Sequence, residues 1–210
     1  MLTVLARCLR HPRVLRVLDR PTVFHAARFL LVGPQRPLKR MVREQLAAGP
    51  DEAVLDVCCG IGELAGIIDA QYVGVDLNAR FVERARRRHR GSSTKAFEVG
   101  DVMRLRFPDK HFDKAILINS LHHFPDDEAV RLLAEVRRVT RRLVVVVDAD
   151  GTPRGIIRRA LLAMDRGRYM RKPDELSGLI GRVFPIQERI QFEAGLYTEV
   201  LFRCGVEGEE

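Results

Sequence analysis

The sequence predicts an α/β fold in which a doubly wound, mostly parallel sheet ends in an antiparallel β-hairpin. Three observations carry this prediction. From residue 53 onward, short apolar runs alternate with segments of helical period, which is typical of a parallel sheet with helices on both faces. Two apolar-rich segments joined at Ala194-Gly195 then indicate a hairpin. The length of 210 residues suits one domain with a sizeable core.

The chain before the alternating region is predicted to be helical. Residues 1–49 are expected to form a basic arm of helical pieces, the last of them over Pro37 to Ala48. Gly49-Pro50 marks the boundary with the main domain, which is expected over 50–204. We expect the arm to act as a lid on that domain.

Apolar periodicity divides the main domain into its elements. Strands are expected near residues 53–57, 72–76, 95–99, 113–118 and 142–148, with hairpin strands over 186–194 and 196–203. Helices are expected over residues 62–70, 79–90, 127–139 and 153–164. Residues 205–210 are expected to be a frayed tail.

Composition excludes several classes of protein. No run of about 18 apolar residues is present, so we expect no transmembrane helix. Arginines interrupt the N-terminal segment, which argues against a secretory signal. The four cysteines form no C-x-x-C pair, so we expect a reduced, cytoplasmic protein without a metal site.

Positive charge is concentrated in the N-terminal arm. Residues 1–43 hold ten Lys or Arg and one acid, Asp19, whereas the net charge of the whole chain is +8. Two interpretations stay open. The arm binds an anionic partner, for which a peripheral membrane surface is a candidate, or it is a solvated helical face.

The segment Val54 to Ala65, VLDVCCGIGELA, is the most informative stretch of the chain. An apolar run ends in Asp56, a loop of small residues follows with Gly60 and Gly62, and the next apolar run ends near Asp76. Glycines let backbone approach a ligand, and a carboxylate at the second strand tip can accept hydrogen bonds from ribose hydroxyls. The arrangement therefore predicts a site for an adenosine-containing cofactor.

Two cofactors fit this pattern at first sight. The run GIGELA also matches the dinucleotide pattern G-x-G-x-x-G/A, so an NAD(P)-dependent oxidoreductase stays an alternative. A carboxylate at Asp56 would repel a pyrophosphate but suits the ammonium of a methionyl group. A further acid, Asp101, follows the third strand, and the chain closes in a hairpin. These three observations favour S-adenosylmethionine.

These motifs resemble the class I S-adenosylmethionine-dependent methyltransferases over about residues 50–203. The glycine motif of that family is usually D-x-G-x-G-x-G, and Cys58 stands where the first glycine would be. The LDVCCG version resembles that of ubiquinone/menaquinone-biosynthesis methyltransferases. The resemblance implies a Rossmann-like sheet and S-adenosylmethionine as cofactor, with S-adenosylhomocysteine as product.

The resemblance also implies roles for the methionyl end of the cofactor. Gly60 and Gly62 would line it, with Cys58 in the same loop, and Asp56 would lie near the ammonium. Asn119, which ends a predicted strand, would offer its carbonyl to that ammonium. A simple turn at the glycines and an ordinary loop residue at position 119 are the structural alternatives.

At the adenosine end the resemblance implies four further contacts. Asp76 would hold the ribose hydroxyls and Leu77 would pack on the adenine. Asp101 would accept from the adenine amino group, and the Val102 backbone would bind a ring nitrogen. For Asp101 a helix cap is the alternative role.

Candidate catalytic residues follow the fourth strand, where ligands bind in doubly wound folds. His122 and His123 could accept a proton from a phenol or an acidic carbon, because histidine titrates near neutrality. Methyl transfer needs a base only if the acceptor carries a proton that must leave. The alternative is that both histidines shape the loop. Asp126 is expected to cap the following helix.

The acceptor is expected to be a small molecule, methylated on oxygen or carbon, since motifs typical of nucleic-acid or protein methylation are absent. Residues 1–48 and 152–178 are expected to form its pocket. Their bulky apolar groups, with arginines such as Arg168 and Arg171, favour a hydrophobic or anionic acceptor. A non-catalytic cofactor-binding or scaffold protein of the same fold stays open, and nucleic acid is not an expected partner.

Overall fold

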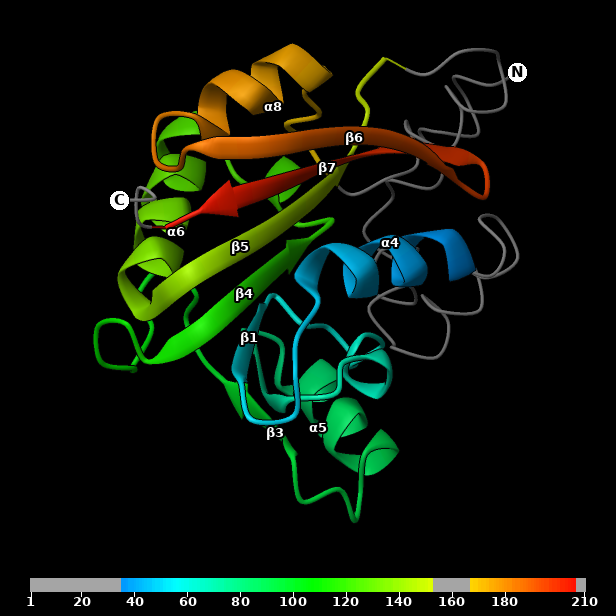
Figure 1. Cartoon of the computed structure of the whole chain (residues 1–210), viewed down its shortest axis with the longest axis vertical. Helices are drawn as coiled ribbons and strands as arrows, with labels where there is room; N and C mark the ends of the chain where they lie inside the picture. Colours follow the sequence, from blue (N-terminus) through cyan, green and yellow to red (C-terminus); the bar gives the residue numbers. More distant parts are fainter. Residues whose placement is uncertain (1–34, 153–166, 207–210) are drawn as a thin grey trace, which may run out of the picture.

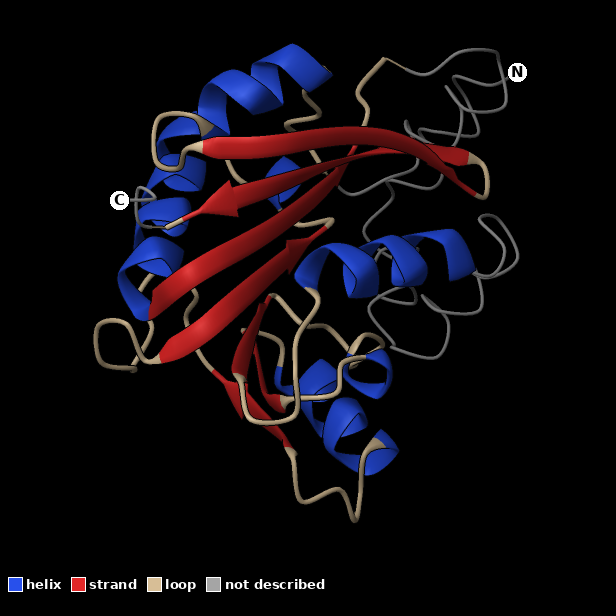
Figure 2. Ribbon diagram, viewed as in Figure 1, coloured by secondary structure: helices blue, strands red, loops and turns tan. Residues whose placement is uncertain are grey.

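The computed structural model describes residues 35–152 and 167–206, and its centre is a seven-stranded sheet (Figures 1 and 2). The strand order is β3-β2-β1-β4-β5-β7-β6. The strands are β1 (Ala53–Val57), β2 (Gln71–Asp76), β3 (Lys95–Val99), β4 (Phe112–Ile118), β5 (Thr140–Ala149), β6 (Ile186–Ala194) and β7 (Tyr197–Gly205). The helices are α4 (Arg36–Leu46), α5 (Ala79–Arg88), α6 (Asp126–Val139) and α8 (Pro173–Ile180), with 3₁₀ turns η1 (Ala65–Ile67) and η2 (Leu121–His123).

The strand pairings confirm the predicted fold class. Strands β1 to β5 pair in parallel, whereas β7 pairs antiparallel with both β5 and β6. The chain winds outward in one direction from β1 to β3 and in the other from β4 to β5. The crevice beyond the carboxyl ends of β1 and β4 lies at this reversal, which is where ligands bind in open α/β sheets.

Helices cover the two faces of the sheet as separate layers. On one face, α4, η1 and α5 pack through an apolar cluster that includes Leu38, Val42 and Val82, all of them buried. On the other face, α6 and α8 pack through a second cluster that includes Leu132 and Leu176. Burial of these apolar side chains is the main contribution to the stability of the fold.

Helix α4 fixes the end of the expected arm against the main domain. Leu38, Val42 and Leu46 repeat at helical spacing, are at most 2% exposed and join the core cluster beneath them. The pieces expected before residue 35 lie outside the described residues, as does the helix expected over 153–164. No helix of the described ranges is long and apolar enough to span a bilayer.

Three local expectations differ from the structure. The helix expected over 62–70 is a series of turns with only the short η1, which ends because Ile68 is already extended at φ of −102° and ψ of 114°. Helix α8 occupies part of the segment assigned above to the acceptor pocket, and its buried face packs on α6. Strand β7 continues to Gly205, inside the expected tail.

Candidate functional site

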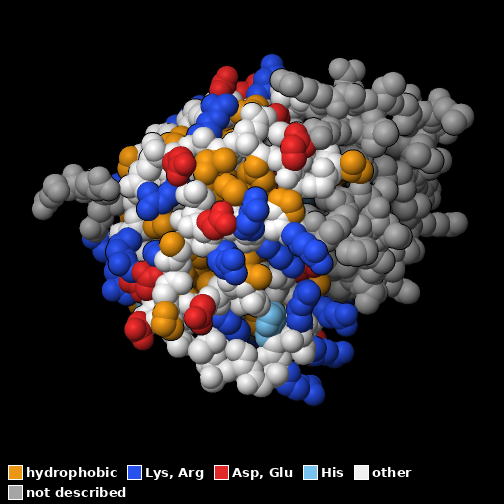
Figure 3. Space-filling model, turned by 45° about the vertical axis from the view of Figure 1, so that its right-hand side comes forward, with side chains coloured by type: hydrophobic (Ala, Val, Ile, Leu, Met, Phe, Trp, Pro, Cys, Tyr) orange, Lys and Arg blue, Asp and Glu red, His pale blue; other side chains and the backbone are white. Residues whose placement is uncertain are grey.

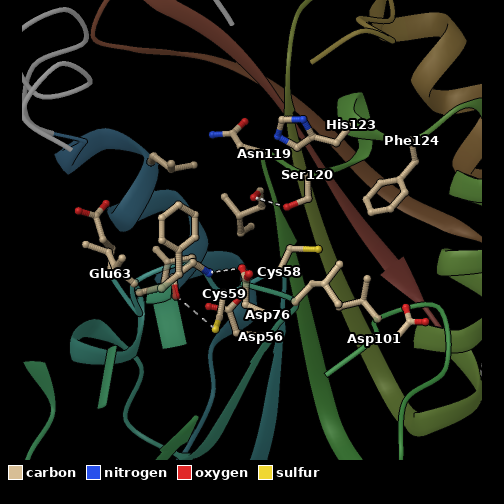
Figure 4. Close-up of a pocket in the computed structure, with 18 of the residues that line it drawn as sticks. Asp56, Cys58, Cys59, Glu63, Asp76, Asp101, Asn119, Ser120, His123 and Phe124 are labelled. Carbon is tan, nitrogen blue, oxygen red and sulfur yellow. Dashed lines mark hydrogen bonds between the residues drawn. The ribbon is translucent and has the colours of Figure 1, made fainter. Parts of the chain in front are cut away.

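A pocket of about 440 Å³ opens at the carboxyl ends of β1, β2 and β4. Figure 4 shows it from close by, with Asp56 and Asp76 below, Asn119 and His123 above, and Glu63 and Asp101 at opposite ends of the view. The first turn of α4, the loop after β1, the start of α5 and the turn after β3 supply the remaining walls. The pocket therefore lies at the reversal of the strand order.

The loop after β1 is held in a tight form by its own backbone. The Cys59 N–H donates to Val75 O, and the Gly62 N–H donates to Cys59 O, both at 3.0 Å. The Gly60 N–H donates to Asp76 Oδ2 at 2.9 Å, which ties the loop to the tip of β2. A Cβ atom at Gly60 would meet no atom within 4 Å, so the backbone there is open to a ligand.

The other predicted residues of this loop have different surroundings. Cys58 lines the pocket with φ of +60°, a left-handed conformation that costs a non-glycine residue about 1–2 kcal/mol. Burial raises the pKa of its thiol to about 12, so the side chain is neutral. Gly62 is not part of the pocket wall. A Cβ there would lie 2.7 Å from the Phe97 ring, so this glycine serves close packing.

Asp76 organises the second strand tip. Besides Gly60, it accepts from the Asn78 N–H through Oδ1 at 2.8 Å, and the Asn78 side chain caps α5. Each carboxylate oxygen has two lone pairs, so both can still accept from a ligand hydroxyl. Next to it, Leu77 lines the pocket with 72% of its surface exposed, and Phe81 reaches the pocket from α5.

Asp56 lies at the base of the pocket and is 2% exposed. The Tyr72 hydroxyl donates a hydrogen bond to its Oδ2. Burial raises the pKa of Asp56 from 3.8 to about 7, the Tyr72 hydrogen bond opposes that rise, and the charge of Asp76 adds to it. The carboxyl is therefore divided between its two protonation states near neutral pH.

The turn after β3 forms one end of the pocket. Asp101 is exposed, and its Oδ1 accepts from the Met103 N–H at 2.9 Å, so it stabilises this turn rather than a helix. Val102 is 6% exposed and lines the same end, together with Met103. The structure thus brings Asp101 and Val102 to the pocket that Asp76 and Leu77 also line.

Asn119 follows β4 and adopts φ of +51°, which asparagine tolerates better than most residues. Its amide Nδ2 donates to Glu199 Oε1 on β7 at 3.3 Å. Its Oδ1 is buried and has no hydrogen-bond partner within the described part of the chain. An unsatisfied buried acceptor costs about 1–3 kcal/mol.

The two predicted catalytic histidines have different surroundings, although their ring centroids lie 4.3 Å apart. His123 is exposed and lines the pocket. His122 is 4% exposed and is not part of the wall; its Nδ1 bonds Asp148, and its backbone N–H donates to Asp148 Oδ2 at 3.0 Å. These contacts suit the alternative that His122 shapes the loop, and its role as a base stays a prediction.

The loop that carries His123 is braced by Arg171, which is 6% exposed. Its guanidinium donates to the carbonyls of Leu121 and Phe124 at 3.0 and 2.7 Å, and to Asp126 Oδ1 at 2.9 Å. The charge of Arg171 is thus used inside the protein and is not offered to an anionic acceptor, contrary to the expectation. Asp126 lies inside α6 and binds Arg171, and Pro125 takes the N-cap position.

The ionisable side chains of the pocket wall are mainly acidic. Four carboxyl residues line it, whereas no Lys or Arg does so within residues 35–152 and 167–206. The carboxyl residues are Asp56, Glu63, Asp76 and Asp101. This arrangement attracts a cationic group and disfavours a pyrophosphate.

Sequence reasoning missed several residues of the site. Tyr72 and Asp148 act on Asp56 and His122 from other strands. Asp148 lies near the carboxyl end of β5, a position like that of Asp56 in β1, so the same signal could have found it. Glu199 lies on an antiparallel strand and Phe81 on a helix, and no local pattern points to either.

Part of this chain is similar in sequence to known proteins. Residues 54–142 match a family model described as a methyltransferase domain. The O-methyltransferase cnsE of Penicillium expansum is 39% identical over 117 residues, which cover 51% of this chain and 42% of that protein. The 2-phytyl-1,4-naphtoquinone methyltransferase of Synechococcus elongatus is 35% identical over 121 residues, covering 53% and 51%. The chain spans about half the length of these curated relatives.

Solved structures share the fold at lower identity. The geranyl diphosphate C-methyltransferase of Streptomyces coelicolor A3(2), crystallised with S-adenosyl-L-homocysteine, superposes with a TM-score of 0.67 at 13% identity, covering 81% of this chain and 76% of that one. The [4+2]-cyclase SpnF gives 0.67 at 18% identity, covering 80% and 79%. Residues 54–142 are thus similar to a methyltransferase domain, and the sheet has the fold of these solved structures.

Proposed function

We propose that this chain is an S-adenosylmethionine-dependent methyltransferase that methylates oxygen or carbon of a small hydrophobic acceptor. One observation carries the proposal. The open backbone at Gly60, the carboxylate of Asp76 and Asn119 after β4 line a single pocket of about 440 Å³. A pocket of this size accepts a ligand the size of a nucleoside derivative.

The residues of the pocket fit this cofactor group by group. Asp76 would accept from the ribose hydroxyls, and the exposed face of Leu77 would pack on the adenine. Asp101 and the Val102 backbone would bind the adenine edge. The Asn119 carbonyl would accept from the methionyl ammonium, beside Asp56 and the loop of Cys58 and Gly60. S-adenosylmethionine supplies an electrophilic methyl group on a sulfonium centre.

The charge of the wall supports this cofactor over a dinucleotide. Four carboxyl residues without a Lys or Arg in the described wall suit a ligand with a sulfonium and an ammonium. A nicotinamide dinucleotide would bring a pyrophosphate to the same carboxylates. The oxidoreductase alternative therefore has no support from the pocket.

The pocket wall around His123 combines polar and apolar residues, with Asn119 and Ser120 beside Phe124 (Figure 4). Ile118, at the end of β4, adds a further apolar side chain to the pocket wall. His123 would accept the proton of a phenol, an enol or an acidic carbon as the acceptor attacks. Relatives named for a phytyl naphthoquinone, for fatty acids and for tocopherol act on lipophilic compounds, which supports an acceptor of this kind.

A binding test separates the candidate functions. Thermal unfolding is measured with S-adenosylmethionine, S-adenosylhomocysteine, NADH or no ligand. Ligand at about 100 times its Kd stabilises the native state by about 2.7 kcal/mol, which shifts Tm by roughly 5–10 °C at this chain length. We expect a shift with the two sulfur compounds alone. A shift in Tm with NADH alone, or the absence of a shift with every one of these ligands, contradicts the proposal.

Binding alone does not prove methyl transfer, because the fold also occurs in a protein named as a cyclase. The second arm is transfer of isotope-labelled methyl groups to hydroquinones, phenols and fatty acids, read by mass spectrometry. His123→Gln is expected to lose transfer to acceptors with an acidic proton and to keep cofactor affinity. Cofactor binding without transfer to any acceptor would support the non-catalytic alternative instead.

A further inference from the structure

The two helical layers of the sheet carry opposite charge. Helices α4 and α5, on one face, hold nine Lys or Arg and two Glu. Helices α6 and α8, on the other face, hold three Arg and six acids. The positive charge of these four helices is therefore gathered on one side of the sheet.

Eight of the nine cations of this face are exposed to solvent, and Lys39 is half-buried. The basic face is formed by Arg36, Lys39, Arg40, Arg43, Arg80, Arg84, Arg86, Arg87 and Arg88. The side chains of Arg40 and Arg87 are 68% and 66% exposed. In Figure 3, Lys and Arg side chains gather from the centre to the lower right of the described surface. Exposed cations on one surface add up to a positive potential that attracts an anionic partner.

Acidic residues of the same layer reduce this charge without cancelling it. Glu44 pairs with Arg40 at 3.9 Å and Glu83 with Arg87 at 2.8 Å, both as exposed pairs within a helix. Glu63, on the loop after β1, lies 3.8 Å from Arg88. Exposed pairs of this kind contribute little and are screened by salt, so the face keeps a positive excess.

The basic face borders the mouth of the pocket. Leu38 from the first turn of α4 and Phe81 from the first turn of α5 both line the pocket. Leu77, just before α5, is 72% exposed at the same place. A flat anionic surface that rests on these helices would thus lie beside the opening through which an acceptor enters.

We propose that the face formed by α4 and α5 docks on an anionic lipid bilayer, with the pocket mouth beside the membrane. The docking stands on the charge of the face, and the delivery of an apolar acceptor from the bilayer rests on the proposed function. A polyanionic strand threaded to the mouth would meet the pocket carboxylates, whereas a bilayer meets only the helix face. Each Lys or Arg near an anionic surface strengthens binding, within about one Debye length.

Flotation with large vesicles tests this inference on the full chain. Vesicles contain phosphatidylcholine alone or with 30 mol% phosphatidylglycerol, each in low salt and in 0.5 M salt. We expect binding only to the anionic vesicles and its loss in high salt. Equal binding to neutral vesicles, or preference for a DNA or RNA oligonucleotide over anionic vesicles at the same salt, overturns the proposal.

Two variants with the same loss of charge locate the surface. The test variant removes three cations of the basic face, Arg40→Gln, Arg84→Gln and Arg87→Gln. The control variant removes three exposed cations elsewhere, Arg131→Gln, Arg182→Gln and Arg189→Gln. We expect the test variant to bind anionic vesicles roughly 100-fold more weakly and the control to bind nearly as the wild type.

Equal losses in the two variants would show that net charge or the N-terminal arm, rather than this face, drives binding, and would overturn the assignment. Folding is checked by the Tm of each variant. Cofactor affinity is measured by calorimetry on the same samples, without any acceptor. A wild type that binds vesicles but no cofactor would refute the proposed function and leave the docking surface standing. A wild type that binds the cofactor but no vesicles would refute the docking surface and leave the proposed function standing.

Discussion

The buried carboxyl of Asp56 makes the stability of the protein depend on pH in a defined direction. Its pKa is raised from 3.8 to about 7, chiefly by burial, so the native state holds a proton that the unfolded chain releases. Below about pH 4 the Asp56 carboxyl is protonated in both the native and the unfolded state, so it does not change the free energy of unfolding. Between pH 4 and pH 7 the unfolded state is progressively favoured, and above pH 7 the cost is complete.

The cost follows from the difference between the two pKa values. About three pH units at 1.36 kcal/mol each give a destabilisation of about 4 kcal/mol at pH 8, as an upper bound. Asp56→Asn removes the titrating group and keeps an oxygen that can accept from the Tyr72 hydroxyl. We expect this variant to gain stability relative to the wild type as pH rises from 4 to 8.

The assay is urea unfolding of both proteins at pH 4.5, 6 and 8, because the difference between them cancels groups that titrate alike in each. Tyr72→Phe is the control. It removes the hydrogen bond that lowers the native-state pKa of Asp56, so the loss of stability should continue to a higher pH than in the wild type. A free-energy difference between Asp56→Asn and wild type that stays constant from pH 4.5 to 8 would refute the reasoning.

Three further variants test other parts of the site. Asp76→Ala should weaken S-adenosylmethionine binding by about 1–3 kcal/mol in calorimetry, whereas the exposed Asp127→Ala on α6 should not; equal affinities would sink the ribose assignment. Cys58→Gly, which suits φ of +60°, should be more stable than Cys58→Val by about 1–2 kcal/mol, and a valine variant as stable as wild type would contradict the left-handed backbone. Arg171→Lys keeps the charge but not the three-way donation, so urea unfolding should show a loss of about 2–3 kcal/mol; no loss would remove the brace.

Features that depend on local sequence could be predicted. The parallel strands stand out as short apolar runs because both faces of a parallel sheet are covered by helices, and the run from Leu143 to Val147 in β5 is an example. Asp76 could be assigned to a strand tip for the same reason. The hairpin followed from the turn at Gly195, which adopts φ of +68°.

The expected helix over 62–70 failed because apolar spacing does not report backbone conformation. Leu64, Ala65 and Ile68 are buried at a spacing that suits one face of a helix. The chain forms turns and the short η1 before it extends at Ile68, so the same side chains reach the core from an irregular loop. A periodic pattern this close to two glycines is compatible with either structure.

The remaining errors concern contacts between residues far apart in the chain. Arg171 was assigned to an acceptor by its charge, yet it lies 50 positions from Leu121, whose carbonyl it binds. His122 likewise bonds Asp148, which lies 26 positions away in the chain. Composition and spacing describe which groups a segment carries, and only the packed structure decides whether a group is used internally or offered to a ligand.

At Asp56 the position follows from the local sequence, whereas the pKa follows from tertiary packing. Its place at the end of β1 follows from the apolar run before it, so the motif brought it correctly to the pocket. Its protonation near neutral pH follows from burial against Tyr72, which contributes from β2, the neighbouring strand. A cation in the pocket would favour the ionised carboxyl by Coulomb attraction, and burial alone favours the protonated one. The same buried group that lowers the stability of the protein above neutral pH is therefore the one best placed to respond to a cationic ligand.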